Sequence, residues 1–187
     1  MKVIVTGNAR SGSSFITNLI HIITNYHCGP PKEIIGGDKN NKWGYWEHSN
    51  LNKHDRQYQR KIGADFFNPD PTFSTNIDDN KFIDFANGVK NIVNRDNIEL
   101  YKNNTLMISP QLYQNIFPNV KWVYTERPIE DAYRSRFGAP MDKSSYESMV
   151  KNRIKCWKNS PISKDALTIN YTSFEKNIEK EILKIQT

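Results

Sequence analysis

The stretch Lys2-Val-Ile-Val-Thr-Gly-Asn-Ala-Arg-Ser-Gly-Ser-Ser14 joins a short apolar run to a turn rich in glycine and serine. The run over residues 2–6 predicts a buried strand, and Ser13 to about Tyr26 carries apolar side chains at helical spacing. The order strand, glycine-containing loop and helix is typical of the start of an α/β fold, where a tight turn follows the first parallel strand. This stretch therefore decides the class of fold that we expect.

The rest of the chain continues this alternation of strands and helices. We predict strands over 105–108, 121–125 and 166–171, and helices over 49–61, 79–94, 110–117, 130–137 and 145–158. A capping box at Thr172-Ser-Phe-Glu175 predicts that a terminal helix begins there. Such an order implies an α/β fold of three layers, with a mostly parallel central sheet covered by helices on both faces.

The composition narrows the class of protein. The chain has 187 residues, which suits a single domain over 1–187. Its 26 Lys and Arg residues against 20 Asp and Glu residues give a net charge of +6, which favours an anionic ligand. The charges are scattered, without a block of like charge, so a mildly basic solvated surface is the plainer interpretation and we expect no nucleic-acid partner.

Several other classes are not expected. No apolar run approaches the roughly 18–20 residues of a membrane span, and the apolar run after Met1 is too short for a signal peptide. Cys28 and Cys156 form no CxxC motif, so we expect a cytoplasmic protein without a disulfide framework. We expect no metal site, because no metal-binding spacing relates the four histidines, His21, His27, His48 and His54.

The loop after the first strand is a candidate anion site. Gly7 and Gly12 have the spacing of the beginning of a Walker A loop, but Ser13 stands where that motif requires lysine. Successive N–H groups of the turn and of the helix N-terminus would face a phosphate, and Arg10 adds a planar cationic donor. The loop also offers the hydroxyl groups of Ser11, Ser13 and Ser14. The simpler alternative is a tight turn followed by a serine-capped helix.

A second candidate follows the predicted strand 121–125. Arg127 stands at the end of that strand, Ser135 comes eight positions later, and Asp131 lies midway between them. An arginine fork suits a terminal phosphate, because it donates two parallel hydrogen bonds. The simpler alternative is that Arg127 pairs with Glu126 or Glu130 on the surface, where such pairs contribute little.

The two candidate sites together resemble those of sulfotransferases that use 3′-phosphoadenosine 5′-phosphosulfate (PAPS). Residues 10–15 are similar to the 5′-phosphosulfate loop of that family, and Arg127 with Ser135 is similar to its 3′-phosphate motif. Residues 42–47 resemble a Gly-Tyr-Phe/Trp-Glu segment of bacterial-type members, and residues 169–175 resemble a late Tyr-Glu-Asp-Leu segment. The chain departs from the family at Ile108-Ser-Pro-Gln111 and at Thr172, and it lacks the C-terminal glycine-rich loop of cytosolic members.

This resemblance implies a P-loop-like domain that transfers a sulfuryl group from PAPS to a hydroxyl or amine of a small-molecule or carbohydrate acceptor. The resemblance also implies roles for individual residues. Arg10 would stabilise charge on the bridging oxygen, Ser11, Gly12, Ser13 and Ser14 would hold the 5′-phosphosulfate, and Arg127 and Ser135 would hold the 3′-phosphate.

Sulfuryl transfer also needs a base near the acceptor hydroxyl. The candidates are Glu47, Glu33, His48 and His54. Glu47 leads, because its segment follows the first loop and lies among the aromatic residues Trp43, Tyr45 and Trp46. The alternative is that these aromatic residues pack in the core and that Glu47 caps a helix beginning near Ser49.

Two other functions stay open from the sequence. One is a small-molecule kinase of the P-loop class that lacks the usual lysine, and the other is a catalytically inactive nucleotide-binding module. We expect the acceptor pocket to involve residues 28–76, which are rich in turn-forming residues, together with the helix near 144–158.

Overall fold

Four parallel strands form the central sheet of the computed structural model, which describes all residues except 39–40, 42–43, 71–78, 136–140, 178–182 and 184–187. The strands are β1 (Val3–Gly7), β2 (Leu100–Lys102), β3 (Lys121–Glu126) and β4 (Leu167–Asn170), in the spatial order β2-β1-β3-β4. Val5 of β1 lies beside Lys102 of β2 and Val123 of β3. All four strands therefore end at the same edge of the sheet, where α/β folds bind ligands.

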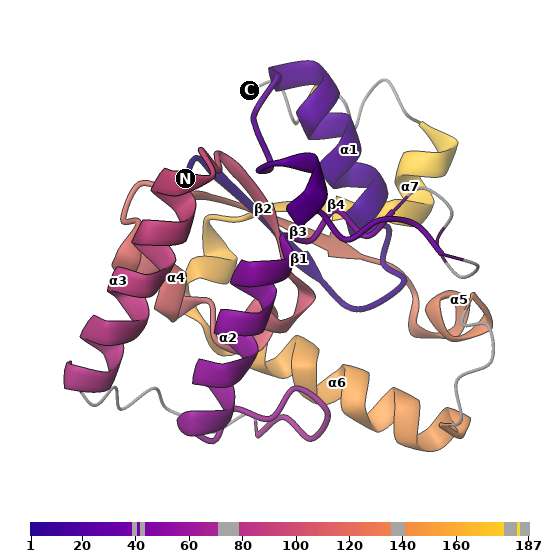
Figure 1. Ribbon diagram of the computed structural model, residues 1–187. Coiled ribbons are helices and arrows are strands. Elements are labelled where there is room, and N and C mark those ends of the chain that lie inside the picture. Colours follow the sequence, from indigo (N-terminus) through magenta and orange to yellow (C-terminus); the bar gives the residue numbers. More distant parts are fainter. Residues whose placement is uncertain (39–40, 42–43, 71–78, 136–140, 178–182, 184–187) are drawn as a thin grey trace.

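Helices cover both faces of this sheet. They are α1 (Ser13–Thr24), α2 (Ser49–Lys61), α3 (Asp79–Arg95), α4 (Gln111–Ile116), α5 (Ile129–Arg134), α6 (Lys143–Asn159) and α7 (Tyr171–Lys176). Short 3₁₀ helices lie at η1 (Pro31–Glu33), η2 (Asn104–Ile108) and η3 (Pro161–Lys164). Figure 1 shows α1 and α7 on one face of the sheet and α2, α3, α4 and α6 on the other. The predicted three-layer α/β fold is confirmed.

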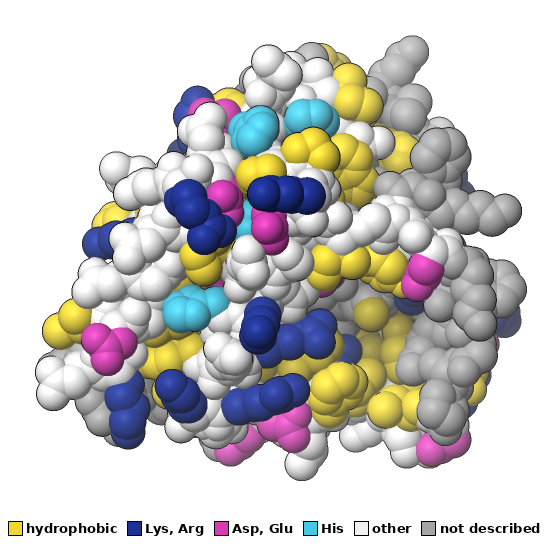
Figure 2. All heavy atoms as spheres, viewed as in Figure 1, with side chains coloured by type: hydrophobic (Ala, Val, Ile, Leu, Met, Phe, Trp, Pro, Cys, Tyr) yellow, Lys and Arg dark blue, Asp and Glu magenta, His cyan; other side chains and the backbone are white. Residues whose placement is uncertain are grey.

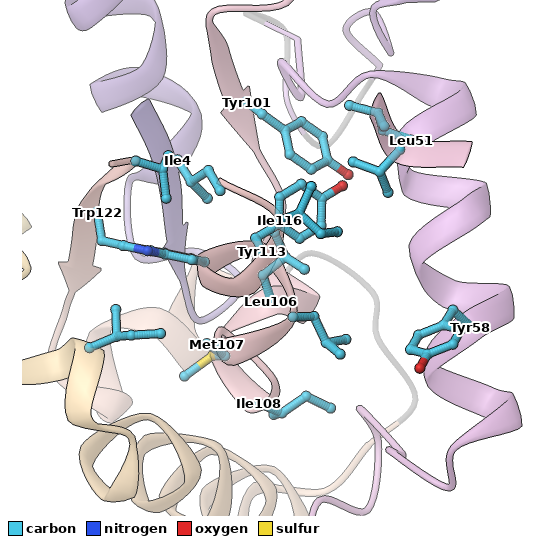
Figure 3. Packing of buried hydrophobic residues seen from close by; sticks show 14 of the residues in the cluster. Ile4, Leu51, Tyr58, Tyr101, Leu106, Met107, Ile108, Tyr113, Ile116 and Trp122 are labelled. Atoms are coloured by element: carbon cyan, nitrogen blue, oxygen red, sulfur yellow. The ribbon is translucent and has the colours of Figure 1, made fainter. Parts of the chain in front are cut away.

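The alternation of side chains along each strand divides the core between the two faces. Val5 and Val123 pack with α1 and α7, whereas Ile4, Trp122 and Tyr124 pack with the helices of the opposite face. This second cluster is the larger one, and Figure 3 shows Tyr101 of β2 and Tyr113 of α4 meeting beside Leu51 of α2. Since side chains of a strand alternate between faces, a sheet buried on both sides needs this nearly continuous apolar composition.

The predicted strand over 105–108 is wrong. These residues form the 3₁₀ helix η2, and the strand of this region is β2, a few residues earlier. Asn103 ends the ladder: its N–H donates to Val5 O at 3.1 Å, and its side-chain oxygen accepts from Thr105 N–H at 2.9 Å. Residues 105–108 are nevertheless buried, and a short buried apolar run does not by itself separate a strand from a helical turn.

The predicted capping box over 172–175 is also wrong. The helix α7 begins at Tyr171, and its cap is Asn170, whose side-chain oxygen accepts from Ser173 N–H at 3.1 Å. The helix predicted over 130–137 corresponds to α5, and the last residues of that range lie outside the described residues. The helix predicted over 49–61 is confirmed at both ends as α2. Of the helices that the structure describes, none is long and apolar enough to cross a membrane.

Candidate functional site

The loop between β1 and α1 makes a tight turn that contains two left-handed residues. Arg10 and Gly12 are in the left-handed region, with φ of 70° and 86°. The turn is closed by Ser11 N–H, which donates to Asn8 O at 3.1 Å, and α1 begins with Ile16 N–H bonded to Gly12 O at 3.0 Å. Alternation between right- and left-handed residues makes neighbouring N–H groups converge, as in phosphate-binding loops.

The serine hydroxyls of this loop hold it against neighbouring segments. Each has a protein partner: Ser11 Oγ lies 2.7 Å from Thr125 Oγ1, Ser13 Oγ donates to Asn104 Oδ1 at 3.1 Å, and Ser14 Oγ donates to Tyr45 O at 3.2 Å. These bonds join the loop to the ends of β3 and β2 and to the segment before α2. Backbone N–H groups are therefore the donors best placed for an anion, and a direct contact from the hydroxyls stays a prediction.

Tyr171 packs directly over Gly12. A Cβ atom at Gly12 would overlap the Tyr171 ring, so a side chain here is incompatible with the observed ring position. The same ring lies against Arg127, whose guanidinium carbon is 5.1 Å from the ring centroid. Gly12 therefore allows the close approach of an aromatic ring, which places the loop beside Arg127, and its contact with a ligand stays a prediction.

The two candidate sites, far apart in sequence, meet in the structure. Arg10 Nε donates to Ser135 Oγ at 3.4 Å, and Ser135 Oγ donates to Ala132 O at 2.8 Å. The contact joins the loop after β1 to the end of α5, across 125 positions of sequence. The residues predicted to bind the two ends of one nucleotide therefore lie at one edge of the sheet.

Arg127 carries a buried hydrogen-bond donor. In the described part of the chain its Nε is buried without a hydrogen-bond partner. The pairs proposed as the simpler alternative are absent from that part: Glu130 pairs with Lys143 at 2.6 Å, and Glu126 accepts from Asn170 at 3.4 Å. A buried donor without an acceptor costs about 1–3 kcal/mol, and an anionic ligand would remove this cost.

Glu47 forms a buried ion pair with Lys102, the last residue of β2. Lys102 Nζ lies 2.6 Å from Glu47 Oε1, and Asn52 Nδ2 donates to Glu47 Oε2. The Lys102 side chain is 2% exposed. Burial lowers the pKa of Lys102, and the nearby Glu47 carboxylate opposes this shift. The sheet edge thus holds a carboxylate fixed by two donors, beside an amine that the sequence interpretation missed.

Two of the other candidate bases serve the start of α2. Glu33 accepts a hydrogen bond from Ser49 Oγ at 2.8 Å. His48 is buried and caps the helix, because its Nδ1 accepts from Leu51 N–H at 3.4 Å while its Nε2 lies 3.1 Å from Asp96 Oδ2. The cap of α2 is therefore His48, and the alternative role of Glu47 as its cap is wrong.

The remaining candidate, His54, packs between α2 and α3. Its ring stacks on Phe85 at 5.2 Å, and its Nε2 lies 3.2 Å from Phe85 O. Trp46 packs against the smaller core cluster, and Trp43 lies outside the described residues. Among the four candidates, and within the described residues, Glu47 is the one bonded to a residue at the end of a sheet strand.

A buried polar network joins α2 and α4 to the end of β2. The Asp55 carboxylate accepts hydrogen bonds from Tyr101 (2.6 Å), Asn103 (2.8 Å) and Tyr113 (2.8 Å). Figure 3 shows the hydroxyl groups of the two tyrosines turned towards each other beside α2. Burial raises the pKa of Asp55 to about 7, while its three donors oppose this shift. The network ties α2 to the strand that carries Lys102.

Comparison with known proteins assigns this chain to no family. No protein-family model matches the chain, and a search of curated proteins finds no match. Within the described residues, no group of three or more His, Cys, Asp or Glu side chains could hold a metal ion. The arrangement combines a tight glycine-containing loop, a half-buried arginine whose Nε has no partner among the described residues, and a carboxylate held by lysine.

Proposed function

We propose that the protein is a sulfotransferase that moves a sulfuryl group from PAPS to a hydroxyl or amine of a small-molecule or carbohydrate acceptor. The observation that carries this proposal is the meeting of the loop after β1 with Ser135 and Arg127 at one sheet edge. Two cationic positions there suit the two phosphate ends of PAPS. The unpartnered Nε of Arg127 supports an anion at the second position.

In this proposal the 5′-phosphosulfate lies against the backbone N–H groups at the start of α1. The 3′-phosphate lies against Arg127, with Ser135 beside it. Arg10 contacts Ser135 and belongs to the loop, so its guanidinium stands between the two phosphates and is suited to charge that develops at the leaving group. The ring of Tyr171 limits the space over Gly12 and helps to orient Arg127.

The transfer is an in-line displacement at sulfur. The acceptor oxygen forms a bond to sulfur while the bond from sulfur to the 5′-phosphate oxygen breaks, and the Glu47 carboxylate accepts the acceptor proton. The products are the sulfated acceptor and 3′-phosphoadenosine 5′-phosphate. Lys102 and Asn52 hold the Glu47 carboxylate in place, and the proposal assigns no step to a metal.

We place this activity in the cytoplasm. Cys28 and Cys156 are free thiols, which is typical of proteins in reducing compartments. The clustering of the cationic site residues at strand ends supports a small nucleotide ligand rather than a nucleic-acid polymer.

One observation favours a second candidate, a small-molecule kinase. The loop lacks the Walker lysine, but Lys102 supplies a buried amine at the end of the neighbouring strand β2. In a kinase such an amine would contact the transferred phosphate, and turnover would require Mg²⁺ and ATP. The pairing of Lys102 with Glu47 favours the sulfotransferase proposal, because the amine is already engaged.

Calorimetry with 3′-phosphoadenosine 5′-phosphate and AMP tests the proposal. We expect the bisphosphate to bind at least about tenfold more tightly, since a charge-assisted hydrogen bond contributes about 1.5–3 kcal/mol. Arg127→Gln should remove this difference, whereas Arg134→Gln, at an exposed arginine of α5, should leave it unchanged.

Equal binding of the two nucleotides would overturn the proposal. Magnesium-dependent turnover of ATP would favour the kinase instead. Transfer of labelled sulfate from PAPS to any acceptor in a screen would exclude an inactive nucleotide-binding module.

A further inference from the structure

Trp46 has a backbone conformation that is unusual for its residue type. Its φ is 57°, in the left-handed region, where a bulky side chain strains the backbone. Within the described residues, three other non-glycine residues have a positive φ: Asn25 and Asn97, of a type that tolerates it, and Arg10. Arg10 belongs to the loop after β1, and Trp46 directly precedes Glu47. Strained backbone conformations of this kind cluster at functional sites.

The left-handed residue interrupts a short antiparallel pairing of the chain before α2. Ile35 O accepts from Tyr45 N–H at 3.1 Å, and Ile35 N–H donates to Glu47 O at 2.8 Å. In a regular antiparallel ladder a single residue would make both of these bonds. Here Tyr45 and Glu47 divide them, with Trp46 as the residue between, as in a β-bulge. A bulge changes the direction of the side chains beside it, so this one determines where Glu47 points.

The side chains of Trp46 and Glu47 reach different parts of the fold. The Trp46 ring packs on the smaller core cluster, 5.5 Å from the ring of His21 in α1. The Glu47 carboxylate reaches Lys102 at the end of β2 and Asn52 of α2. The packed ring therefore fixes the place of the chain, and the left-handed turn directs the next side chain towards Lys102.

Glu47 has other cations in the same part of the fold. Lys53, Arg56 and Arg60 recur at helical spacing along α2, and Figure 2 shows Lys and Arg side chains gathered over this helix. The charge of Arg56 acts on the buried pair, since it helps to lower the pKa of Lys102. A pair with an exposed cation would leave the carboxylate in water, whereas the pair with Lys102 takes it largely out of water at a cost in solvation. The observed pair therefore needs a carboxylate that is held in place.

We propose that Trp46 is a positioning residue, whose packed ring and left-handed backbone hold the Glu47 carboxylate at Lys102 Nζ. The inference rests on the proposed function, in which Glu47 is the base, and it deepens that function by naming what orients the base. Trp46 acts through Glu47, and a contact of its ring with a substrate is not part of the proposal.

Titration of Lys102 by NMR, in protein with isotope-labelled lysine, tests this role without nucleotide or acceptor, and Lys102→Arg assigns the signal. The Glu47 carboxylate raises the pKa of Lys102, so a displaced carboxylate lowers this pKa. We expect a lower pKa in Trp46→Ala and a pKa close to that of the wild type in Trp46→Phe, which keeps an aromatic ring. Leu19→Ala is the matched control, because it truncates another side chain that packs on the same core cluster. This control should leave the pKa of Lys102 unchanged.

A double variant separates positioning from a general loss of stability. Glu47→Gln should lower the pKa of Lys102 in the wild-type background and change it little further in Trp46→Ala, because the carboxylate is already displaced there. Trp46→Leu, which keeps an apolar side chain in the cluster, makes the same test if Trp46→Ala does not fold.

An unchanged pKa of Lys102 in these Trp46 variants, or an equal decrease in Leu19→Ala, would overturn the inference. Calorimetry with 3′-phosphoadenosine 5′-phosphate distinguishes this failure from that of the proposed function. If the pKa of Lys102 falls as expected while the nucleotide does not bind to the wild type, the positioning of Glu47 by Trp46 stands and the proposed function fails.

Discussion

Replacing Glu47 by glutamine tests the buried ion pair at the sheet edge. The Lys102 side chain is 2% exposed and its Nζ lies 2.6 Å from Glu47 Oε1, so the substitution leaves a buried ammonium without its counter-charge. Removing one partner of a buried pair costs about 3–5 kcal/mol. Because Glu47 itself is 13% exposed, water reaches one side of the pair, and we expect the lower end, about 3 kcal/mol.

The stability that Glu47→Gln loses should become smaller as pH rises. Burial lowers the pKa of Lys102 and Glu47 opposes this, so without Glu47 the pKa falls further below 10.5. The folded variant then binds fewer protons than its unfolded state, and its stability rises as pH rises towards 10.5.

Urea denaturation of the wild type and of Glu47→Gln, at about pH 7 and about pH 9, measures this dependence of stability on pH. The deficit of Glu47→Gln should be smaller at the higher pH. Glu147→Gln is the control, because it breaks an exposed pair with Lys151 at 3.7 Å and should cost little at either pH. A Glu47→Gln variant as stable as the wild type at neutral pH, or a deficit that does not shrink at the higher pH, would refute the reasoning.

Three further predictions concern the site and its support. Gly12→Ala should cost at least about 1–2 kcal/mol in urea denaturation, because φ is 86° there and the new Cβ would overlap the Tyr171 ring; unchanged stability would contradict the packing described. Burial raises the pKa of Asp55 in the folded state to about 7. Between about pH 4 and this value, the folded state holds a proton that the unfolded state has lost, so the free energy of unfolding falls as pH rises. The stability difference between wild type and Asp55→Asn should therefore decrease from about pH 5 to about pH 8, and a constant difference would exclude this titration. Addition of EDTA should leave the affinity for 3′-phosphoadenosine 5′-phosphate unchanged in calorimetry, because Arg10 and Arg127 supply the positive charge; a loss would show that a metal takes part.

The sequence was most informative where local pattern and tertiary structure agree. The helix predicted over 49–61 agrees with α2 at both ends, and the apolar runs over 2–6 and 121–125 are the strands β1 and β3, which the structure shows to be neighbours. The strand near residue 100 was misplaced, because the side chain of Asn103 turns the chain into a buried 3₁₀ helix that resembles a strand in composition.

Because this strand was misplaced, Lys102 was not predicted as a residue of the site. Lys102 is the last residue of β2, but a strand over 105–108 places it in a connecting segment, where no pattern marks it as a site residue. Its pairing with Glu47, 55 positions earlier, depends on tertiary contacts that no local pattern contains. The same holds for the contact between Arg10 and Ser135, which only the order of strands in the sheet brings together.

A crystal structure of the complex with 3′-phosphoadenosine 5′-phosphate tests the central claim most directly. We predict the 5′-phosphate within hydrogen-bond distance of the backbone N–H groups at the start of α1. We predict the 3′-phosphate on Arg127, with Nε of that arginine donating to it and Ser135 alongside. A nucleotide bound elsewhere on the surface, or one whose 3′-phosphate lies away from Arg127, would contradict the account.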